Sequence, residues 1–205
     1  LLIPIVKGFS TEMGVEIASI GIQVHGGMGY IEETGAAQTL RDVRITTIYE
    51  GTTGIQSNDL IGRKVGRDRG AAMFALLDDM TRELEALPAT AAASATTAAL
   101  TGVADLRAST ESLLQSLGSA PDRAMAVSVP YLRLCGIVIG GWLLAKSAAI
   151  AAERIAGQTT DSEFFSAKLR SAHFYAEQIM PMAGALARIV QSGAASVVET
   201  DAAHI

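Results

Sequence analysis

The sequence contains a single cysteine, Cys135, among its 205 residues. One cysteine excludes a disulfide within the chain and argues against a cysteine-based metal site. Its neighbours, Leu134 and residues 136–138, are apolar. We therefore expect a buried, inert thiol, which is compatible with a reducing compartment.

Aromatic residues make up only 5% of the chain, and strand signals are nearly absent. No run of alternating β-branched residues lies between turn-forming pairs, as a half-buried strand would require. Alanine dominates the second half, and alanine favours helix over every other conformation. The predicted fold class is therefore all-α.

Positive charge is not in excess in either part of the chain. Residues 1–65 contain 5 Lys/Arg and 7 Asp/Glu, a net charge of −2, and residues 66–205 contain 11 and 14, a net charge of −3. Nucleic acids and anionic membranes both require clustered positive charge. The composition therefore predicts neither a nucleic-acid nor a membrane partner.

Long hydrophobic runs are missing as well. The most membrane-like stretch, LCGIVIGGWLLA at 134–145, is bounded by Arg133 and Lys146. A membrane-spanning helix needs about 20 apolar residues, so we predict a buried core helix here. The chain opens with LLIPIVK, without Met or a basic region, and resembles no signal peptide. We expect a fragment of a longer protein and, by default, a cytoplasmic location.

The first third of the sequence reads as short helices interrupted by glycine. Apolar residues recur at spacings of three and four over residues 1–24, which predicts a helix that ends at Gly26. The expected order is then a glycine loop, a short helix, a chain reversal and a helix capped by Thr52 or Thr53. Their expected ranges are 26–33, 34–46, 47–51 and 53–65.

The remainder reads as long helices. A boundary between about residues 66 and 90 divides the chain into predicted domains 1–66 and 67–205. Pro130 and Pro181 are expected to kink the helices that contain them. The turn at 157–160 is short, so the two helices that it joins are expected to be antiparallel. The expected helices are 71–86, 94–117, 121–156 and 161–193.

Two short stretches are candidates for chemistry. QVHGGMGYIEE contains Gly26, Gly27 and Gly29 directly after a helix. Such a loop either ends the helix as a C-cap or exposes backbone N–H groups to a phosphate. It is not a P-loop, because no Gly-Lys-Ser/Thr follows, and not a Rossmann fingerprint, because no strand precedes it.

YEGTTGIQ places the carboxylate of Glu50 between Tyr49 and Gly51, just before a helix. An acid here is favoured by the helix dipole alone. The functional interpretation is a general base that removes a weakly acidic C–H proton, with Gly51 leaving space for the substrate.

The blocks QVHGGMGY, LRDVRI and IYEGT, in this order and spacing over residues 1–65, resemble the C-terminal part of the acyl-CoA dehydrogenases. The continuation TGIQSNDLIGRKVGRD and the helical remainder resemble the subgroup with an extra C-terminal helical domain. That subgroup includes enzymes similar to methylthiopropanoyl-CoA dehydrogenase.

The resemblance implies a parent enzyme with an N-terminal helical domain, a middle β-domain and a C-terminal four-helix bundle. FAD lies between the last two, and a neighbouring subunit of a homodimer or homotetramer completes the site. This chain resembles the second half of that bundle, followed by an additional long-helix bundle. The implied partners are an acyl-CoA substrate and electron-transfer flavoprotein.

By the same resemblance, Glu50 matches the catalytic base that removes the α-proton, and its N–H matches the donor to the thioester carbonyl. Tyr49 and Gly51 match positions beside the acyl group, and Thr52 matches a residue near the FAD of its own subunit. The positions that match the segment meeting the FAD of the adjacent subunit are Gln23, His25, Gly26 and Gly27.

Two other interpretations compete with the enzyme. Some relatives with long helical extensions associate with DNA, but the net charge of −3 over 66–205 weighs against that role. Alternatively, the extension is a non-catalytic oligomerisation unit, which is compatible with an enzymatic parent. The isolated 205-residue chain is expected to be inactive.

Overall fold

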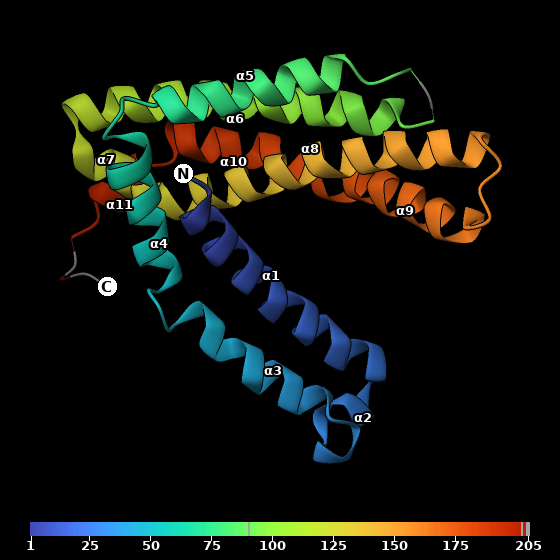
Figure 1. The fold of residues 1–205 in the computed structure, drawn as a ribbon. Helices are drawn as coiled ribbons and strands as arrows, with labels where there is room; N and C mark the ends of the chain where they lie inside the picture. Colours follow the sequence, from blue (N-terminus) through green and yellow to red (C-terminus); the bar gives the residue numbers. More distant parts are fainter. Residues whose placement is uncertain (90, 202, 204–205) are drawn as a thin grey trace.

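A computed structural model of the chain describes residues 1–89, 91–201 and 203, and within them every regular element is helical. The prediction of an all-α fold is confirmed (Figure 1). Two short 3₁₀ segments, η1 and η2, and two π-helical segments, η3 and η4, accompany the α-helices. The elements are α1 (Leu2–His25), α2 (Gly27–Tyr30), η1 (Glu32–Thr34), α3 (Ala36–Arg44), η2 (Ile45–Thr47), α4 (Thr53–Asp59), η3 (Leu60–Val65), α5 (Ala71–Glu85), α6 (Ala93–Ser119), α7 (Pro121–Ala126), α8 (Ser128–Ala156), α9 (Ser162–Phe174), η4 (Tyr175–Ile179), α10 (Pro181–Ser192) and α11 (Ala195–Val198).

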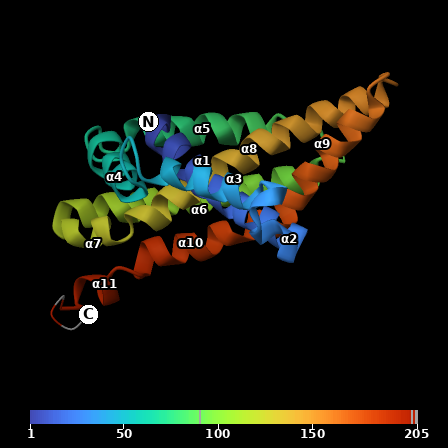
Figure 2. The same cartoon turned by 90° about the horizontal axis from the view of Figure 1, so that it is seen from below.

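The molecule consists of a bundle of long helices and a projecting arm. In the bundle, α8 packs against α6, α9 and α10, and α5 packs against α6. The arm is formed by α1 and α3, which pack together and are joined at their outer end by α2 (Figure 1). Figure 2, seen from below, shows the arm in front of the bundle, so the arm extends outward from this side. As predicted, α8 and α9 form an antiparallel hairpin around a short turn.

The centre of the bundle is the apolar helix α8. By length and composition it could cross a membrane, but more than half of its most hydrophobic window is buried inside the protein. Its side chains from Tyr131 to Val138 supply much of the core, as predicted for a core helix. Cys135 is fully buried, and that burial raises its pKa well above the usual range. The expectation of an inert thiol is therefore supported.

Apolar side chains of α1, at the base of the arm, and of η3, which follows α4, enter the core of the bundle. Ile5 from α1 and Leu60, Ile61 and Val65 from η3 belong to the same buried cluster as the core of α5, α6 and α8. Burial of each such side chain contributes about 1.5–3 kcal/mol. The core is thus continuous across residue 66, while the domain boundary at that position stays a prediction.

Two glycines allow α1 and α8 to approach closely. A Cβ on Gly136 of α8 would lie 2.2 Å from the ring of Phe9, and one on Gly8 of α1 would lie 2.8 Å from Leu132. Real Cβ atoms do not approach that closely, so a side chain at either position would force Phe9 or Leu132 to shift. The first two turns of α1 are therefore fixed against α8.

The prediction of one helix over 121–156 is wrong. The chain forms α7, breaks at Val127 and restarts as α8 at Ser128. Pro130 explains the restart, because proline lacks an N–H and is tolerated only in the first turn of a helix. Pro181 likewise follows the π-helical segment η4, so the second predicted interruption is observed.

The prediction of an open glycine loop over 26–33 is also wrong. Residues 27–30 form one turn of helix, α2, and residues 32–34 form η1. Within the predicted domain 67–205, residues 90, 202, 204 and 205 lie outside the described part of the chain.

Candidate functional site

Glu50 lies in a tight reversal between η2 and α4. The N–H of Tyr49 donates to the carbonyl oxygen of Ile45 at 3.1 Å, which turns the chain. Glu50 then adopts φ 54° and Gly51 φ 92°. A left-handed φ is uncommon for a residue with a side chain, and it is enriched at functional sites.

The residues after Glu50 each have a distinct local role. A Cβ on Gly51 would lie 3.0 Å from Nε2 of Gln56, and the positive φ independently favours glycine there. Thr52 is the N-cap of α4, because its Oγ1 accepts a hydrogen bond from the N–H of Ile55 at 3.3 Å. The sequence left Thr52 and Thr53 open as caps, and the structure selects Thr52.

Three side chains from outside the turn contact it, and the sequence reasoning missed all of them. Nζ of Lys7 donates to the carbonyl oxygen of Gly51 at 2.5 Å, and Nε2 of Gln56 donates to that of Glu50 at 2.9 Å. Thr53 donates its hydroxyl to Glu12 of α1. Gln56 was visible as part of YEGTTGIQ, whereas the contacts of Lys7 and Glu12 join positions more than 40 residues apart.

The turn faces outward with an apolar surround. Glu50 is exposed. Tyr49 is 51% exposed, and Ile48 and Ile55 are 50% and 59% exposed. Within the described part of the chain, the N–H groups of Glu50 and Gly51 have no backbone acceptor. Consecutive free N–H groups in a turn form a small anion-binding concavity.

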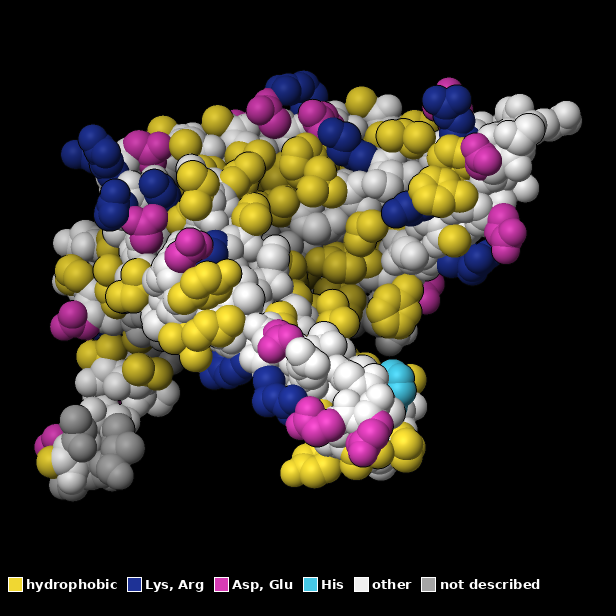
Figure 3. Space-filling model, turned by 60° about the horizontal axis from the view of Figure 1, so that its bottom comes forward, with side chains coloured by type: hydrophobic (Ala, Val, Ile, Leu, Met, Phe, Trp, Pro, Cys, Tyr) yellow, Lys and Arg dark blue, Asp and Glu magenta, His cyan; other side chains and the backbone are white. Residues whose placement is uncertain are grey.

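Residues 23–29 lie at the far tip of the arm. The N–H of Gly26, at φ 61°, donates to the carbonyl oxygen of Gln23 at 3.0 Å, so Gly26 ends α1 as a cap. Nδ1 of His25 bonds the carbonyl oxygen of Gly21 at 2.8 Å. Figure 3 shows hydrophobic side chains gathered at this tip, where Met28 and Tyr30 are 57% and 82% exposed.

The glycines of this segment differ in what requires them. A Cβ on Gly29 would lie 2.4 Å from the carbonyl oxygen of Ile22, so packing of α2 on α1 demands glycine. Gly27 has a φ outside the left-handed region and open space around its missing Cβ. Nothing within the described chain therefore explains glycine at position 27. A ligand or neighbouring chain that approaches the backbone closely would explain it.

The candidate residues thus fall into two groups that do not meet. The structure brings Tyr49, Glu50, Gly51 and Thr52 together in one turn, while residues 23–27 lie at the other end of α3 (Figure 1). A cavity of about 450 Å³ lies beside the second group, between α1 and the start of α3, and His25 and Thr34 contribute to its walls. A site that uses both groups needs two copies of this region, or a ligand that spans α3.

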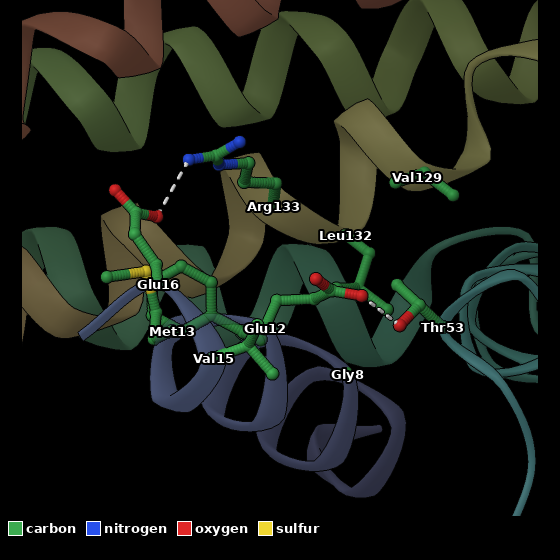
Figure 4. A pocket seen from close by; sticks show the side chains of 10 residues that line it. Gly8, Glu12, Met13, Val15, Glu16, Thr53, Val129, Leu132 and Arg133 are labelled. Carbon is green, nitrogen blue, oxygen red and sulfur yellow. Dashed lines mark hydrogen bonds and ion pairs between the residues drawn. The ribbon is translucent and has the colours of Figure 1, made fainter. Parts of the chain in front are cut away.

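A second cavity of about 300 Å³ lies between α1 and α8, beside the start of α4 (Figure 4). Its walls include Met13 and Val15 of α1 and Val129 and Leu132 of α8. Glu16 pairs with Arg133 at 3.5 Å along one side. This cavity lies behind the turn at the junction of arm and bundle, and it contains no residue of the two candidate groups.

A large, phosphate-containing cofactor such as FAD is compatible with these residues. Gly27 leaves open backbone for close approach, and the exposed side chains of His25 and Thr52 provide hydrogen-bonding groups. No group of three or more His, Cys, Asp or Glu side chains suited to a metal ion exists within the described residues. The candidate residues therefore offer backbone N–H groups, hydroxyls, the amide of Gln23, the imidazole of His25 and a single carboxylate, that of Glu50.

Comparison with known proteins identifies relatives for the whole chain. Residues 1–65 match the family model described as acyl-CoA dehydrogenase, C-terminal domain, and residues 70–201 match that described as acetyl-CoA dehydrogenase C-terminal like. The chain is 49% identical over 182 residues to 3-methylmercaptopropionyl-CoA dehydrogenase of Ruegeria pomeroyi. The aligned segment covers 87% of this chain and 31% of the relative. It is 29% identical over 212 residues to a broad-specificity linear acyl-CoA dehydrogenase of Mycobacterium tuberculosis, covering 99% of this chain and 35% of the relative.

The fold has a solved counterpart. The crystal structure of an acyl-CoA dehydrogenase complexed with FAD from Bacillus anthracis matches 97% of this chain and 33% of that chain, with a TM-score of 0.55 and 19% identity. The present chain thus spans about a third of the length of these relatives.

Proposed function

This chain belongs to the acyl-CoA dehydrogenase family, and from that membership we propose that it is the C-terminal part of an FAD-dependent acyl-CoA dehydrogenase. The enzyme would introduce a double bond between the α and β carbons of an acyl-CoA thioester. The observation that most favours this function is the geometry of Glu50, an exposed carboxylate on a left-handed turn beside Tyr49 and Gly51.

In this proposal Glu50 is the catalytic base. Its carboxylate takes the α-proton of the thioester, and its free N–H donates to the thioester carbonyl, where negative charge develops. Tyr49 lies beside the acyl group, and Gly51 leaves room for it. FAD, when bound, would supply the acceptor for the hydride of the β carbon, and electron-transfer flavoprotein would be the acceptor of the electrons.

The two separate groups of site residues fit a subunit arrangement. Thr52 would lie near the FAD of its own subunit. Gln23, His25, Gly26 and Gly27, at the tip of the arm, would contact the FAD held by a neighbouring subunit. A homodimer or homotetramer would then bring together residues that one chain keeps apart.

The substrate proposed is a short acyl-CoA, with 3-methylmercaptopropionyl-CoA as the first candidate. The support is the 49% identity to the relative of that name. A broad-specificity linear acyl-CoA dehydrogenase is a weaker match at 29% identity. Straight-chain acyl-CoA thioesters such as butyryl-CoA are therefore the second candidates.

The isolated chain is proposed to be inactive, because it spans about a third of its relatives and exposes its site residues. The helices beyond residue 90 would mainly cover a subunit surface. Exposed apolar side chains on the α8–α9 hairpin, Ile150 at 53% and Phe174 at 61%, favour that role. The net charge of −3 over residues 66–205 does not favour DNA as a partner.

The test is an absorbance spectrum of the whole protein that contains this chain. The proposal predicts a yellow flavoprotein whose flavin band is bleached anaerobically by 3-methylmercaptopropionyl-CoA. Butyryl-CoA is the comparison substrate, and the purified 205-residue chain is the colourless control. A colourless whole protein, or a flavin band that no acyl-CoA bleaches, would overturn the proposal.

A further inference from the structure

The turn that contains Glu50 is fixed through its two central carbonyl groups. Gln56 donates from Nε2 to the carbonyl oxygen of Glu50 at 2.9 Å. Lys7 donates from Nζ to the carbonyl oxygen of the next residue, Gly51, at 2.5 Å. The two donors come from different helices, α4 and α1, so the turn is held from both sides.

This turn needs such support. Glu50 and Gly51 are consecutive residues with φ of 54° and 92°. An L-residue in this region is disfavoured and persists only where its surroundings determine it. Without the hydrogen bonds that Lys7 and Gln56 donate to its carbonyl groups, we expect the turn to relax toward a negative φ at Glu50. Relaxation would redirect both its carboxylate and its N–H.

Lys7 is an unusual donor in this setting. It is half-buried, and it forms no ion pair with any carboxylate within the described residues. A lysine ammonium has three donors and pays a high entropic cost when it is immobilised. Its observed partner is a neutral backbone carbonyl of the turn. A charge-assisted hydrogen bond of this kind is stronger than one between neutral groups.

The helix that contains Lys7 is packed on α8. Ile5 and Gly8 of this turn of α1 are buried, and a Cβ on Gly8 would lie 2.8 Å from Leu132 of α8. On the other side, Ser57 of α4 donates to Ser128 of α8 at 3.1 Å inside the protein. Both helices that hold the turn are thus docked on α8, which is part of the extension.

We propose that Lys7 and Gln56 are positioning residues for Glu50, fixing the left-handed turn from which the carboxylate and the N–H act. The inference rests on the proposed function, since it assigns the two residues to that reaction. It also gives α8 a role in catalysis, because α8 anchors α1 and α4, the helices to which the two donors belong.

The experiment uses the whole flavoenzyme with Lys7→Met and Gln56→Met. Each variant removes a donor while keeping a long, flexible side chain. Lys7→Arg is the conservative rescue, because arginine keeps the charge and the donors. Lys168→Met and Gln115→Met, both at exposed positions of the bundle, are the matched controls. Gln56→Glu, which keeps the shape and loses the amide donor, is the second variant should methionine lower the flavin content.

Two readouts separate positioning from general stability. The first is kcat and KM for the best acyl-CoA, with flavin content measured by absorbance. The second is exchange of the α-protons of acetyl-CoA into D₂O. Acetyl-CoA has no β carbon and cannot be dehydrogenated, so exchange reports proton abstraction alone.

The expected result is a fall of at least about tenfold in kcat and in exchange for Lys7→Met and Gln56→Met, since small displacements of a catalytic group are costly. KM and flavin content stay within about threefold of the unmodified enzyme, and Lys7→Arg recovers most of the activity. Exchange and kcat near the unmodified values in both methionine variants would overturn the inference. So would losses that follow flavin content, or a control that loses as much. If the unmodified enzyme neither bleaches nor exchanges, the proposed function fails and the inference fails with it.

Discussion

Gly27 and Gly29 provide a matched pair of substitutions. Packing against α1 explains the glycine at position 29, whereas no contact within the described chain explains the glycine at position 27. A side chain at Gly27 has open space and a φ that does not demand glycine. Gly27→Val is therefore expected to change the free energy of unfolding by no more than about 0.5 kcal/mol, as for other unconstrained surface sites. If FAD of a neighbouring subunit approaches the backbone here, the isopropyl group occupies its place. We expect FAD affinity to fall at least about tenfold, which corresponds to about 1.4 kcal/mol.

Gly29→Ala is the structural counterpart. Its Cβ would lie 2.4 Å from the carbonyl oxygen and 2.9 Å from the Cα of Ile22. Both are backbone atoms of α1 and cannot swing aside, so the cost is about 1–3 kcal/mol of stability. α2 would then separate from α1.

Both variants are measured in the whole enzyme, by flavin content after dialysis and by thermal unfolding of the apoprotein. The reasoning predicts that Gly27→Val loses flavin at unchanged apoprotein stability, while Gly29→Ala loses apoprotein stability. Full retention of FAD by Gly27→Val would refute the assignment of Gly27 to the cofactor. Unchanged stability of Gly29→Ala would refute the packing argument for α2.

Two further predictions concern the bundle. Gly136→Val is expected to separate α1 from α8, because Phe9 occupies the space of the new side chain. The free energy of unfolding should fall by about 1–3 kcal/mol. Chemical denaturation measures this change, and an unchanged denaturation midpoint would contradict the prediction. Lys146 donates to Glu83 at 2.7 Å and, with Trp142, holds the pKa of that carboxyl below its usual range. Stability from this contact is therefore present above the ordinary carboxyl pKa and lost as the pH falls through the lowered value. Lys146→Met should raise the Glu83 pKa in a carboxyl NMR titration, and an unchanged titration would contradict the pairing.

The helices were predictable because their hydrophobic spacing and alanine content are local properties of the sequence. The break at Val127 is not predicted by the sequence pattern, because a proline at position 130 is compatible both with a kink inside one helix and with the first turn of a new helix. The π-helical segment Leu60–Val65 could not be predicted from the sequence, because the change from i→i+4 to i→i+5 hydrogen bonding barely alters the apolar spacing over so few residues.

The candidate site was predictable only where it is local or where a known pattern exists. Glu50 and its neighbours form a contiguous motif, and the structure places them in one turn. The contact between Lys7 and Gly51 spans 44 positions, and its occurrence depends on how α1 docks on α8. The difference between Gly27 and Gly29 could not be predicted from the sequence either, since it depends on whether the backbone of α1 lies next to the glycine. Tertiary approach of this kind leaves no periodic signal in the sequence.

The central claim is that Glu50 is the base, and Glu50→Gln in the whole enzyme tests it most directly. Glutamine keeps the size and the backbone turn but cannot take a proton at neutral pH. Flavin bleaching by acyl-CoA is followed in a single turnover, with flavin content and acyl-CoA binding measured on the same sample. The account predicts retained flavin, retained binding and a bleaching rate lowered by about 10²–10⁴-fold, the usual loss for a missing general base. A bleaching rate near that of the unmodified enzyme would contradict it.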